Sequence, residues 1–219
     1  MGRRKLQRFT ENAARTNVIQ SGKELFEKIK GNWGTLYFKN DHPIVLELGC
    51  GRGEYALGLA RLIPENNFIG VDIKGDRIWM GSEAADQEKL NNVGFLRTQV
   101  QLLGDFFDLD EVDEIWITFP DPRPKKSDIR RRLTNPRFME IYRRLLKPGG
   151  RVHLKTDNEQ LYQYTLEVLT GLPGINGLQY TEDLYHSKLI NPALAIRTHY
   201  EQKFSDQGFT IKYLTFVFS

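Results

Sequence analysis

A continuous apolar run that ends in glycines sets the fold class of this chain. Residues 44–50 read IVLELGC, and Gly49, Gly51 and Gly53 follow one another closely at its end. An apolar run without alternation is typical of a strand buried on both faces of a parallel sheet. Glycines allow positive φ and let a ligand approach the backbone closely. Because residues 53–63 have helical spacing, the N–H groups at the start of that helix can face the same ligand.

Strand and helix patterns alternate through the rest of the chain. Strand patterns lie at 67–73, 93–99, 114–119, 151–157, 179–184 and 210–218, and helical patterns lie at 76–90, 136–146 and 158–172. This alternation predicts an α/β fold with an open parallel sheet and helices on both faces. Ligands of such sheets bind beyond the carboxyl ends of the strands. The polar residues and glycines that follow each strand are therefore the candidates for a functional site.

Length and composition are those of one soluble domain. The chain has 219 residues, 27% of them charged, and is long enough for a single core. We assign residues 1–42, which are polar and basic, to an N-terminal extension and residues 43–219 to the domain. No apolar run approaches the ~20 residues of a membrane helix, and the four histidines show no metal-ligand spacing. The single Cys50 excludes an internal disulfide and fits a reducing compartment, so we expect a cytoplasmic protein without a membrane or metal partner.

The glycine loop and the acids around it predict an adenosine-containing ligand. Asp72 ends the second predicted strand, where an acid can accept hydrogen bonds from both ribose hydroxyls. The dinucleotide fingerprint G-x-G-x-x-G has its third glycine where this chain has Glu54. A carboxylate at Glu47 repels a pyrophosphate but can attract a sulfonium or an amino group. These acids favour S-adenosylmethionine over a nicotinamide dinucleotide. Two alternatives remain open: a nicotinamide dinucleotide, and a glycine turn that binds no ligand.

A single acid framed by prolines precedes a block of positive charge. In FPDPRPKKSDIRRRL, residues 119–133, Asp121 lies between two prolines that restrict the backbone. Residues 121–151 hold 11 Lys and Arg against 3 Asp and Glu, and the first 30 residues hold 8 against 3. Two basic segments on a mildly acidic body indicate a surface for a polyanion. The alternative from charge alone is a solvated basic face.

Taken together, these motifs resemble a known family. VLELGCGRGEYALGLA, the acid in GVDI and LLKPGGRVHLKTD are similar to class I S-adenosylmethionine-dependent methyltransferases. FPDPRPKKSDIRRRL, KTD and THYE, in this order, resemble more narrowly the bacterial tRNA (guanine-N7-)-methyltransferases, over roughly residues 44–218. The resemblance implies a Rossmann-like α/β fold with a mostly parallel sheet and an antiparallel C-terminal strand. It also implies methyl transfer to N7 of a guanine in the variable loop of tRNA, by an enzyme that is either a monomer or a homodimer.

The resemblance implies a set of cofactor residues. In the family, Glu47, Asp72 and Asp121 line the S-adenosylmethionine site, beside the glycine loop formed here by Gly49, Gly51 and Gly53. Gln99 stands where an acidic residue usually faces the adenine, and its amide oxygen can still accept a hydrogen bond from the adenine amino group. Arg123 stands where a tryptophan commonly follows the P-D-P motif. Both departures bear on cofactor affinity and base stacking rather than on the reaction class.

Asp121 is the predicted catalytic residue. Guanine N7 carries a lone pair and no proton, so no general base is required. A fixed carboxylate can orient the base by accepting hydrogen bonds from its N1–H and amino groups. It can also stabilise the positive charge that develops on the purine. The alternative is an acid that caps the local turn.

The remaining predicted contacts are to tRNA. Lys125 matches a lysine that the family places at the RNA, and Arg130, Arg131 and Arg132 are expected at phosphates. The resemblance places Asp157 at the target nucleotide, although Asp157 or Asn158 could instead cap the helix that follows. The family's substrate element T-x-x-E corresponds to Thr198, His199, Tyr200 and Glu201, which alone would indicate a capping box. We also expect the extension 1–42 to be mobile without RNA and to help hold tRNA.

Three other functions remain open from the sequence. The first is a methyltransferase for another RNA, a small molecule or a protein, of which the last two have no need of the clustered basic charge. A nicotinamide-dependent oxidoreductase is disfavoured by Glu47 and Glu54. A non-catalytic RNA-binding module is disfavoured because Glu47, Asp72 and Asp121 are all present.

Overall fold

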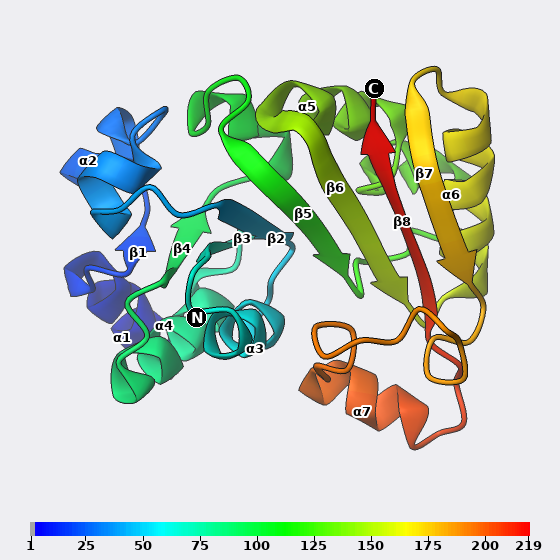
Figure 1. Cartoon of the computed structure of the whole chain (residues 1–219). Helices are drawn as coiled ribbons and strands as arrows, with labels where there is room; N and C mark the ends of the chain where they lie inside the picture. The colour runs from blue at the N-terminus through cyan, green and yellow to red at the C-terminus, as the bar shows by residue number, and fades with distance from the viewer. Residues whose placement is uncertain (1–2) are drawn as a thin grey trace.

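The computed structural model describes residues 3–219 and contains an eight-stranded sheet (Figure 1). The strands are β1 (Val18–Ile19), β2 (Ile44–Leu48), β3 (Asn67–Asp72), β4 (Val93–Arg97), β5 (Val112–Thr118), β6 (Leu146–Thr156), β7 (Ile175–Thr181) and β8 (Lys212–Phe218). Their order in the sheet is β1-β4-β3-β2-β5-β6-β8-β7. Strand β8 runs antiparallel to β6 and β7, and the other described neighbours are parallel. The predicted α/β fold with an antiparallel C-terminal strand is confirmed.

Helices of two kinds connect the strands. The α-helices are α1 (Arg3–Ala14), α2 (Glu24–Lys28), α3 (Glu54–Leu62), α4 (Gly75–Glu88), α5 (Pro136–Leu145), α6 (Glu159–Gly171) and α7 (His199–Ser205). The other kind has a different hydrogen-bond spacing and comprises the π-helix η1 (Trp33–Phe38) and the 3-10 helices η2 (Val100–Asp105) and η3 (Lys126–Arg131). No described helix is long and apolar enough to cross a membrane.

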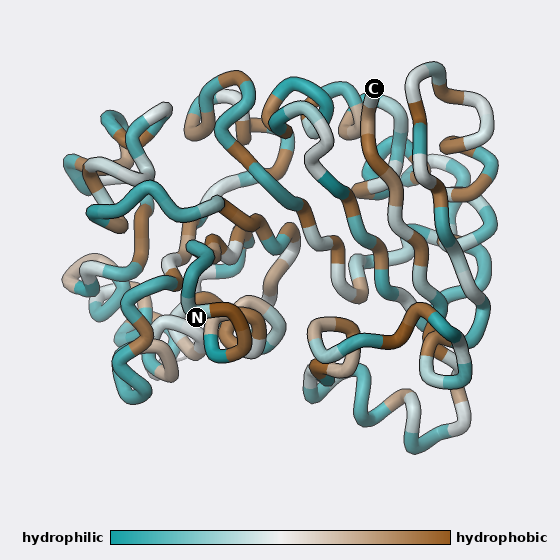
Figure 2. Tube along the Cα trace, in the orientation of Figure 1, coloured by the Kyte–Doolittle hydropathy of each residue, from teal (hydrophilic) through white to brown (hydrophobic). Residues whose placement is uncertain are grey.

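The sheet separates two hydrophobic cores, which explains the unbroken apolar run of β2. Leu46 and Leu48 pack in one core with side chains of α5 and α6, whereas Val45 packs in the other with side chains of α3 and α4. Alternate residues of a strand point to opposite faces, so both faces of β2 are covered. Figure 2 shows hydrophobic residues concentrated along the strands and hydrophilic residues in many outer turns. Helices therefore cover both faces, as the sequence predicted.

Residues 18–38 belong to the same sheet and core as the rest of the chain. Strand β1 pairs with β4, and Trp33 is fully buried. The Trp33 ring stacks on Phe107 with 5.2 Å between ring centroids, and its Nε1 donates to the carbonyl of Phe106 at 2.9 Å. This packing differs from the mobile extension that we expected over residues 1–42. Its anchors are single apolar residues in a polar segment, which give no periodic signal.

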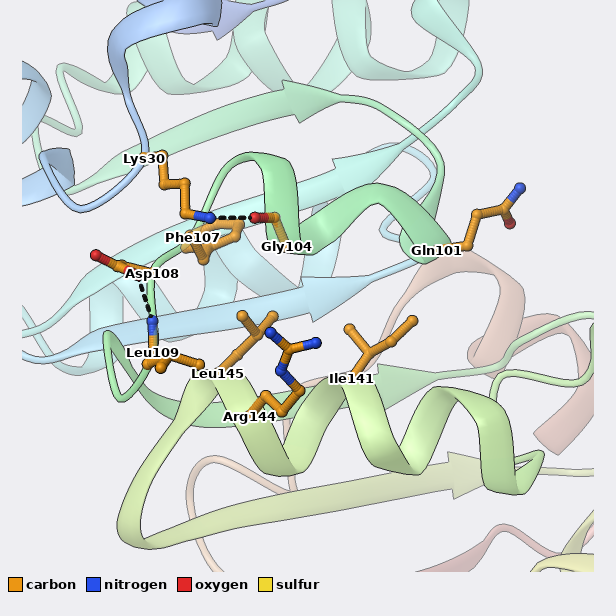
Figure 3. Close-up of a pocket in the computed structure, with 9 residues that line it drawn as sticks. All are labelled: Lys30, Gln101, Gly104, Phe107, Asp108, Leu109, Ile141, Arg144 and Leu145. Carbon is orange, nitrogen blue, oxygen red and sulfur yellow. Dashed lines mark hydrogen bonds between the residues drawn. The ribbon is translucent and has the colours of Figure 1, made fainter.

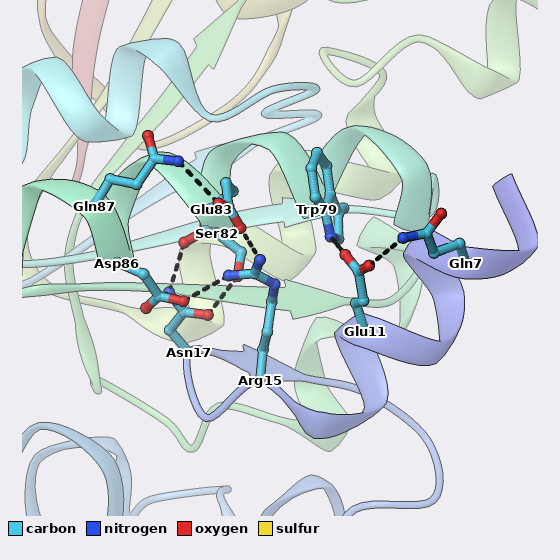
Figure 4. A network of polar contacts seen from close by, with 9 residues as sticks. All are labelled: Gln7, Glu11, Arg15, Asn17, Trp79, Ser82, Glu83, Asp86 and Gln87. Carbon is cyan, nitrogen blue, oxygen red and sulfur yellow. Dashed lines mark hydrogen bonds and ion pairs between the residues drawn. The ribbon is translucent and has the colours of Figure 1, made fainter. Parts of the chain in front are cut away.

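Helix α1 is held against α4 by a polar network (Figure 4). Arg15 forms ion pairs with Glu83 and Asp86, the second with 2.6 Å between nitrogen and oxygen. The indole Nε1 of Trp79 donates to the carboxylate of Glu11 at 2.5 Å. The network fixes α1 to the helix that directly follows β3.

The strand order reverses at the boundary between β2 and β5. Strand β2 pairs with β3 on one side and with β5 on the other. Leu48 lies opposite Ile117, so the carboxyl ends of β2 and β5 are at the same level. Ligands of open α/β sheets bind at such a reversal point, so the functional site is expected at the carboxyl ends of β2 and β5.

Candidate active site

A cavity of about 440 Å³ opens at the carboxyl ends of β2 and β5. The loop after β2 contributes one wall, Thr118 and Phe119 at the end of β5 contribute another, and Arg77 of α4 stands at the side. The first turns of α7 complete the lining. Of the predicted site residues, Glu47, Gly49, Gly51, Thr198, His199 and Tyr200 lie around this one cavity. Segments about 150 positions apart in sequence are thus brought together by the sheet.

The glycine loop has the backbone conformation that the sequence implied. Gly49, Gly51 and Gly53 have φ values of 73°, 56° and 69°, in the left-handed region. At Gly53 a Cβ atom would lie 2.4 Å from the ring of Phe95, so no larger residue fits there. Because the loop runs directly into α3, its backbone and the first N–H groups of that helix face the cavity.

Asp72 shapes this loop. Its Oδ2 accepts a hydrogen bond from the N–H of Gly51 at 2.9 Å, and its Oδ1 accepts one from the N–H of Lys74 at 2.8 Å. A carboxylate has about four acceptor positions, so Asp72 keeps capacity for ribose hydroxyls. The side chain of Gln99 is exposed and accepts a hydrogen bond from Gln101. Neither Asp72 nor Gln99 lines the cavity itself, and their contact with an adenosine stays a prediction.

Glu47 is a buried acid at the floor of the cavity. Its Oε2 accepts a hydrogen bond from the N–H of Ala56 at 2.9 Å, and its Oε1 accepts one from the Oγ1 of Thr118 at 2.6 Å. Burial raises the pKa of Glu47 to about 7, against the lowering effect of these two hydrogen bonds. A positive charge placed nearby would favour the ionised carboxylate.

Asp121 lies outside the cavity lining, on the loop that follows β5. Its side chain is 60% exposed and forms an ion pair with Arg123, with 3.2 Å between Oδ2 and Nε. Its Oδ1 also accepts the N–H of Arg123 at 3.2 Å. Phe119 and Arg123, on either side, have positive φ values of 47° and 48°. Asp121 thus makes the turn interaction that was the alternative role, and it also presents an exposed carboxylate.

The prediction that Arg132 contacts an RNA phosphate is wrong. It is 2% exposed and cannot reach an RNA phosphate in this structure. Its Nε donates to the carbonyl of Pro122 at 3.0 Å, and its Nη2 donates to the carbonyl of Arg123 at 3.2 Å. Its guanidinium also lies 4.5 Å from the centre of the Tyr164 ring. Arg132 therefore fixes the P-D-P loop from inside instead of binding RNA.

The other basic residues of this stretch are exposed beside Asp121. Lys125, Arg130 and Arg131 all lie at the surface on or next to η3. Arg131 forms an ion pair of 3.3 Å with Asp128, and is 66% exposed. Their placement suits phosphate contacts, which remain a prediction.

The THYE segment forms the start of α7. Thr198 is the N-cap residue, and its Oγ1 accepts the N–H of Glu201 at 3.0 Å. The N–H of His199 donates to Oε2 of Glu54 at 2.7 Å, which ties α7 to the start of α3. Tyr200 is 45% exposed, and its ring centroid lies 5.5 Å from that of Phe119.

Glu201 and Asp157 occupy different environments. Glu201 is fully buried, so its carboxylate is not open to a substrate in this structure. Asp157 is half-buried, and burial raises the pKa of its carboxyl against the lowering effects of Lys212 and the nearby Tyr200 phenol. Asn158 caps α6 by accepting the N–H of Leu161 at 2.8 Å, which leaves Asp157 without that structural task.

Several residues of the site were not anticipated from the sequence. Thr118, Arg77 and Lys203 line the cavity together with Phe119, which stands in the expected segment at a strand end but was given no role. Thr118 and Phe119 could have been found, because they directly precede the P-D-P motif. Arg77 and Lys203 carry no signal beyond their charge. Among residues 3–219 no group of three or more His, Cys, Asp or Glu side chains is placed to hold a metal ion.

A second cavity, of about 300 Å³, lies between η2 and α5 (Figure 3). Its lining includes Phe107 and Leu109, which precede β5, and Leu145, which precedes β6. This places it at the amino ends of these strands, away from the ligand-binding end. None of the predicted site residues lines it.

Comparisons with known proteins agree with this geometry. A sequence model of the family described as "Putative methyltransferase" matches residues 41–214. A curated tRNA (guanine-N(7)-)-methyltransferase of Cytophaga hutchinsonii is 50% identical over 219 residues, covering 100% of this chain and 99% of the relative. One of Porphyromonas gingivalis is 53% identical over 189 residues, covering 86% of this chain and 76% of the relative.

The fold itself is shared more widely. The crystal structure of the 16S rRNA methyltransferase KamB superimposes with a TM-score of 0.61 at 16% identity, covering 93% of this chain and 99% of that one. At that identity the likeness concerns the fold alone. The full-length matches to sequence relatives are much closer. The chain belongs to the tRNA (guanine-N(7)-)-methyltransferase family.

Proposed function

We propose that this protein transfers the methyl group of S-adenosylmethionine to N7 of a guanine in tRNA, in the variable loop. The observation that carries the proposal is the cavity at the ends of β2 and β5. There, a glycine loop and a buried acid face an aromatic pair, Phe119 and Tyr200, next to the exposed carboxylate of Asp121. Membership of the family supports the same reaction.

The residues of the cavity suit S-adenosylmethionine. The loop from Gly49 to Gly53 lets an adenosine-containing molecule lie against the backbone, and Asp72 can accept hydrogen bonds from its ribose. Glu47, which is buried at the cavity floor, suits the positive charges of the sulfonium and amino groups. When bound, this molecule supplies an electrophilic methyl group, and the chain has to bring a nucleophile into line with it.

Orientation is the main task of the protein in this reaction. Guanine N7 needs no general base because its lone pair is free, so placement of the base within reach of the methyl group dominates the rate. Asp121 can accept hydrogen bonds from the N1–H and amino groups and stabilise the charge that N7 methylation leaves on the purine. Phe119 and Tyr200 offer an aromatic wall for an unstacked base.

The tRNA backbone would be held on the basic surface beside Asp121. Lys125, Arg130 and Arg131 are exposed there, and phosphate contacts of this kind give affinity and register rather than sequence information. Asp157, near Tyr200, would meet the target nucleotide. A tRNA substrate also fits a cytoplasmic location.

The test is methyl transfer from labelled S-adenosylmethionine to two matched tRNA transcripts, one with guanine and one with adenine in the variable loop. We expect label only in the guanine transcript, and cleavage at that position after reduction and aniline treatment, which N7-methylguanine permits. Label in both transcripts would move the target base elsewhere in tRNA. Absence of label from folded protein that binds the cofactor would overturn the proposed substrate.

A further inference from the structure

Lys155 is a fully buried cation whose three N–H donors are all used. It lies near the carboxyl end of β6, with no exposed side-chain surface. Its Nζ donates to the carbonyls of Leu194 and Ile196 at 3.0 Å each, and to the carboxylate of Glu201 at 3.1 Å. An ammonium group has three donors, so none remains for a substrate or cofactor.

The ion pair between Lys155 and Glu201 is shielded from solvent, and aromatic rings surround the ammonium group. The Lys155 ammonium lies 5.0 Å from the centre of the Tyr55 ring and 5.9 Å from the rings of Phe119 and Tyr185. The phenol of Tyr185 also donates to the Glu201 carboxylate. A buried charge that loses its partner is strongly destabilising, so each member of the pair holds the other in place.

The pair joins parts of the chain that have little regular structure of their own. Residues 182–198 contain no helix or strand, and α7 has seven residues. Helices of that length are marginal by themselves. Lys155 bonds both to this segment and to α7, and it stands two residues before Asp157 in the KTD motif.

The ammonium lies near one side of the proposed base pocket, 5.9 Å from the centre of the Phe119 ring, and bonds to α7, the helix that carries the other side. Phe119, beside it, leads into the loop that carries Asp121. Tyr200, which neighbours Glu201 in α7, packs against Phe119 and has its phenol near the carboxyl of Asp157. Displacement of α7 would therefore change the distance between Tyr200 and the two strand ends at once.

We infer that Lys155 is a positioning residue: through its buried ion pair with Glu201, it sets the place of Tyr200 relative to Phe119 and Asp157 for methyl transfer. The inference rests on the proposed function. Lys155 reaches neither the target base nor the cofactor, and its effect passes through α7.

The first experiment replaces the charge with a side chain of similar length, Lys155→Met. We expect kcat/KM for tRNA to fall on the order of 100-fold, as misplacement of reacting groups does. The decrease should lie mainly in kcat. The dissociation constant for S-adenosylmethionine should change much less, because the glycine loop and Glu47 are untouched. The matched control is Lys147→Met, which removes a lysine paired with Asp113 at the other end of β6 and should keep the wild-type kcat.

Two double variants separate positioning from a general loss of structure. Lys155→Met with Glu201→Gln removes both charges, and we expect it to recover part of the kcat lost in Lys155→Met. Tyr200→Ala and Lys155→Met should be non-additive when combined, because both act on the same contact. Fully additive losses, or a wild-type kcat/KM in Lys155→Met, would overturn the inference. If Lys155→Met does not fold, the same test of non-additivity can be made with Glu201→Gln, Tyr200→Ala and the double variant of these two.

Hydrogen exchange without tRNA tests the inference independently of the reaction. We expect Lys155→Met to speed amide exchange within residues 182–205 while β2 and β5 keep their protection. Unchanged exchange in that segment would overturn the inference even if wild-type protein methylates tRNA. Absence of methyl transfer by wild-type protein would instead overturn the proposed function.

Discussion

The carboxylate of Asp121 lies 3.2 Å from the Nε of Arg123, so the acid expected to meet the guanine already has a partner within its own loop. The pair is open to solvent: the Asp121 side chain is 60% exposed and that of Arg123 37% exposed. An exposed ion pair of this kind contributes little to stability. Arg123 can therefore move aside for a base, or turn to a phosphate of the same nucleotide, at small cost.

Replacement of Asp121 by Asn should separate charge from shape. The amide can still accept the N–H of Arg123, so the loop should keep its form, but it cannot stabilise a positive charge on the purine. We expect kcat to fall about 100-fold to 1,000-fold, the range found when one preorganised electrostatic contact is removed. Single-turnover methylation of tRNA measures this directly.

Asp128→Asn is the matched control for Asp121→Asn. Asp128 pairs with Arg131 in the same basic stretch but lies seven positions further along the chain from the end of β5 than Asp121 does. We expect near wild-type kcat in this variant, and equal binding of S-adenosylmethionine in both variants. A similar loss of kcat in the two would mean that the stretch responds to any change of charge, and Asp121 would have no special role.

The buried Glu47 predicts that cofactor affinity depends on pH. Because its pKa is raised to about 7 in the free protein, Glu47 is protonated below that pH, and a bound cation favours the ionised form. Affinity for S-adenosylmethionine should therefore rise as pH increases toward 7 and level off above it. One coupled proton gives at most about a tenfold change per pH unit. Calorimetric titration between pH 5.5 and 8.5 measures it.

Glu47→Gln should remove that pH dependence and bind the cofactor more weakly. Thr118 can accept as well as donate a hydrogen bond, so the buried contact survives the change. The pH dependence of folding stability has the opposite sign to the pH dependence of cofactor affinity. The folded pKa of Glu47 lies above its ordinary value, so its contribution is fully present at acid pH and is lost as pH rises through 7. Wild type should lose stability relative to Glu47→Gln as the pH rises from 4.5, the ordinary pKa of the carboxyl, to about 7, as measured by urea unfolding.

The sequence predicts the sheet well because buried parallel strands are distinctive. Predicted strands at 44–50 and 67–73 correspond to β2 and β3, each shorter by a residue or two at its end. The two-residue β1 could not be recognised, since so short a strand has no periodicity. Helix α7 was visible only as the capping box at Thr198.

The site residues that could be predicted are those whose position follows from a strand and the loop after it. Residues whose burial depends on distant partners could not be predicted. Glu47 lies within a recognisable strand, Gly49 and Gly51 follow it, and the structure places all three at the cavity. Arg132 and Glu201 look in sequence like their exposed neighbours. Glu201 is turned inward by Lys155, 46 positions away, and such a partner cannot be identified from local sequence.

Trp33 should be essential to the fold, although it lies in the segment assigned to the extension. Its ring is fully buried against Phe107, and large-to-small changes of such residues cost about 3–5 kcal/mol. We expect Trp33→Ala to lower the free energy of unfolding by that amount, measured by urea unfolding followed by circular dichroism. A fragment of residues 43–219 should fail to fold cooperatively. A stable fragment would restore the view of residues 1–42 as a separate extension.

Arg132 and its exposed neighbours should respond in opposite ways to mutation. Arg132→Met keeps the aliphatic stem near Tyr164 but leaves the carbonyls of Pro122 and Arg123 without their donor. Buried acceptors left unpaired cost about 1–3 kcal/mol, and because these two carbonyls are only partly buried, the free energy of unfolding should fall toward the lower end of that range. Binding of tRNA should keep its wild-type salt dependence, because no phosphate contact is lost.

The double variant Arg130→Ala with Arg131→Ala should show the reverse pattern. Both side chains are exposed, so stability should be unchanged. Each phosphate contact that is lost lowers the slope of log K against log salt by about one, and affinity for tRNA should fall accordingly. Fluorescence titrations at several salt concentrations measure the slope for wild type and both variants. A wild-type slope in the double variant would place the RNA backbone on another face, whereas a reduced slope in Arg132→Met would show that the P-D-P loop itself carries a phosphate contact.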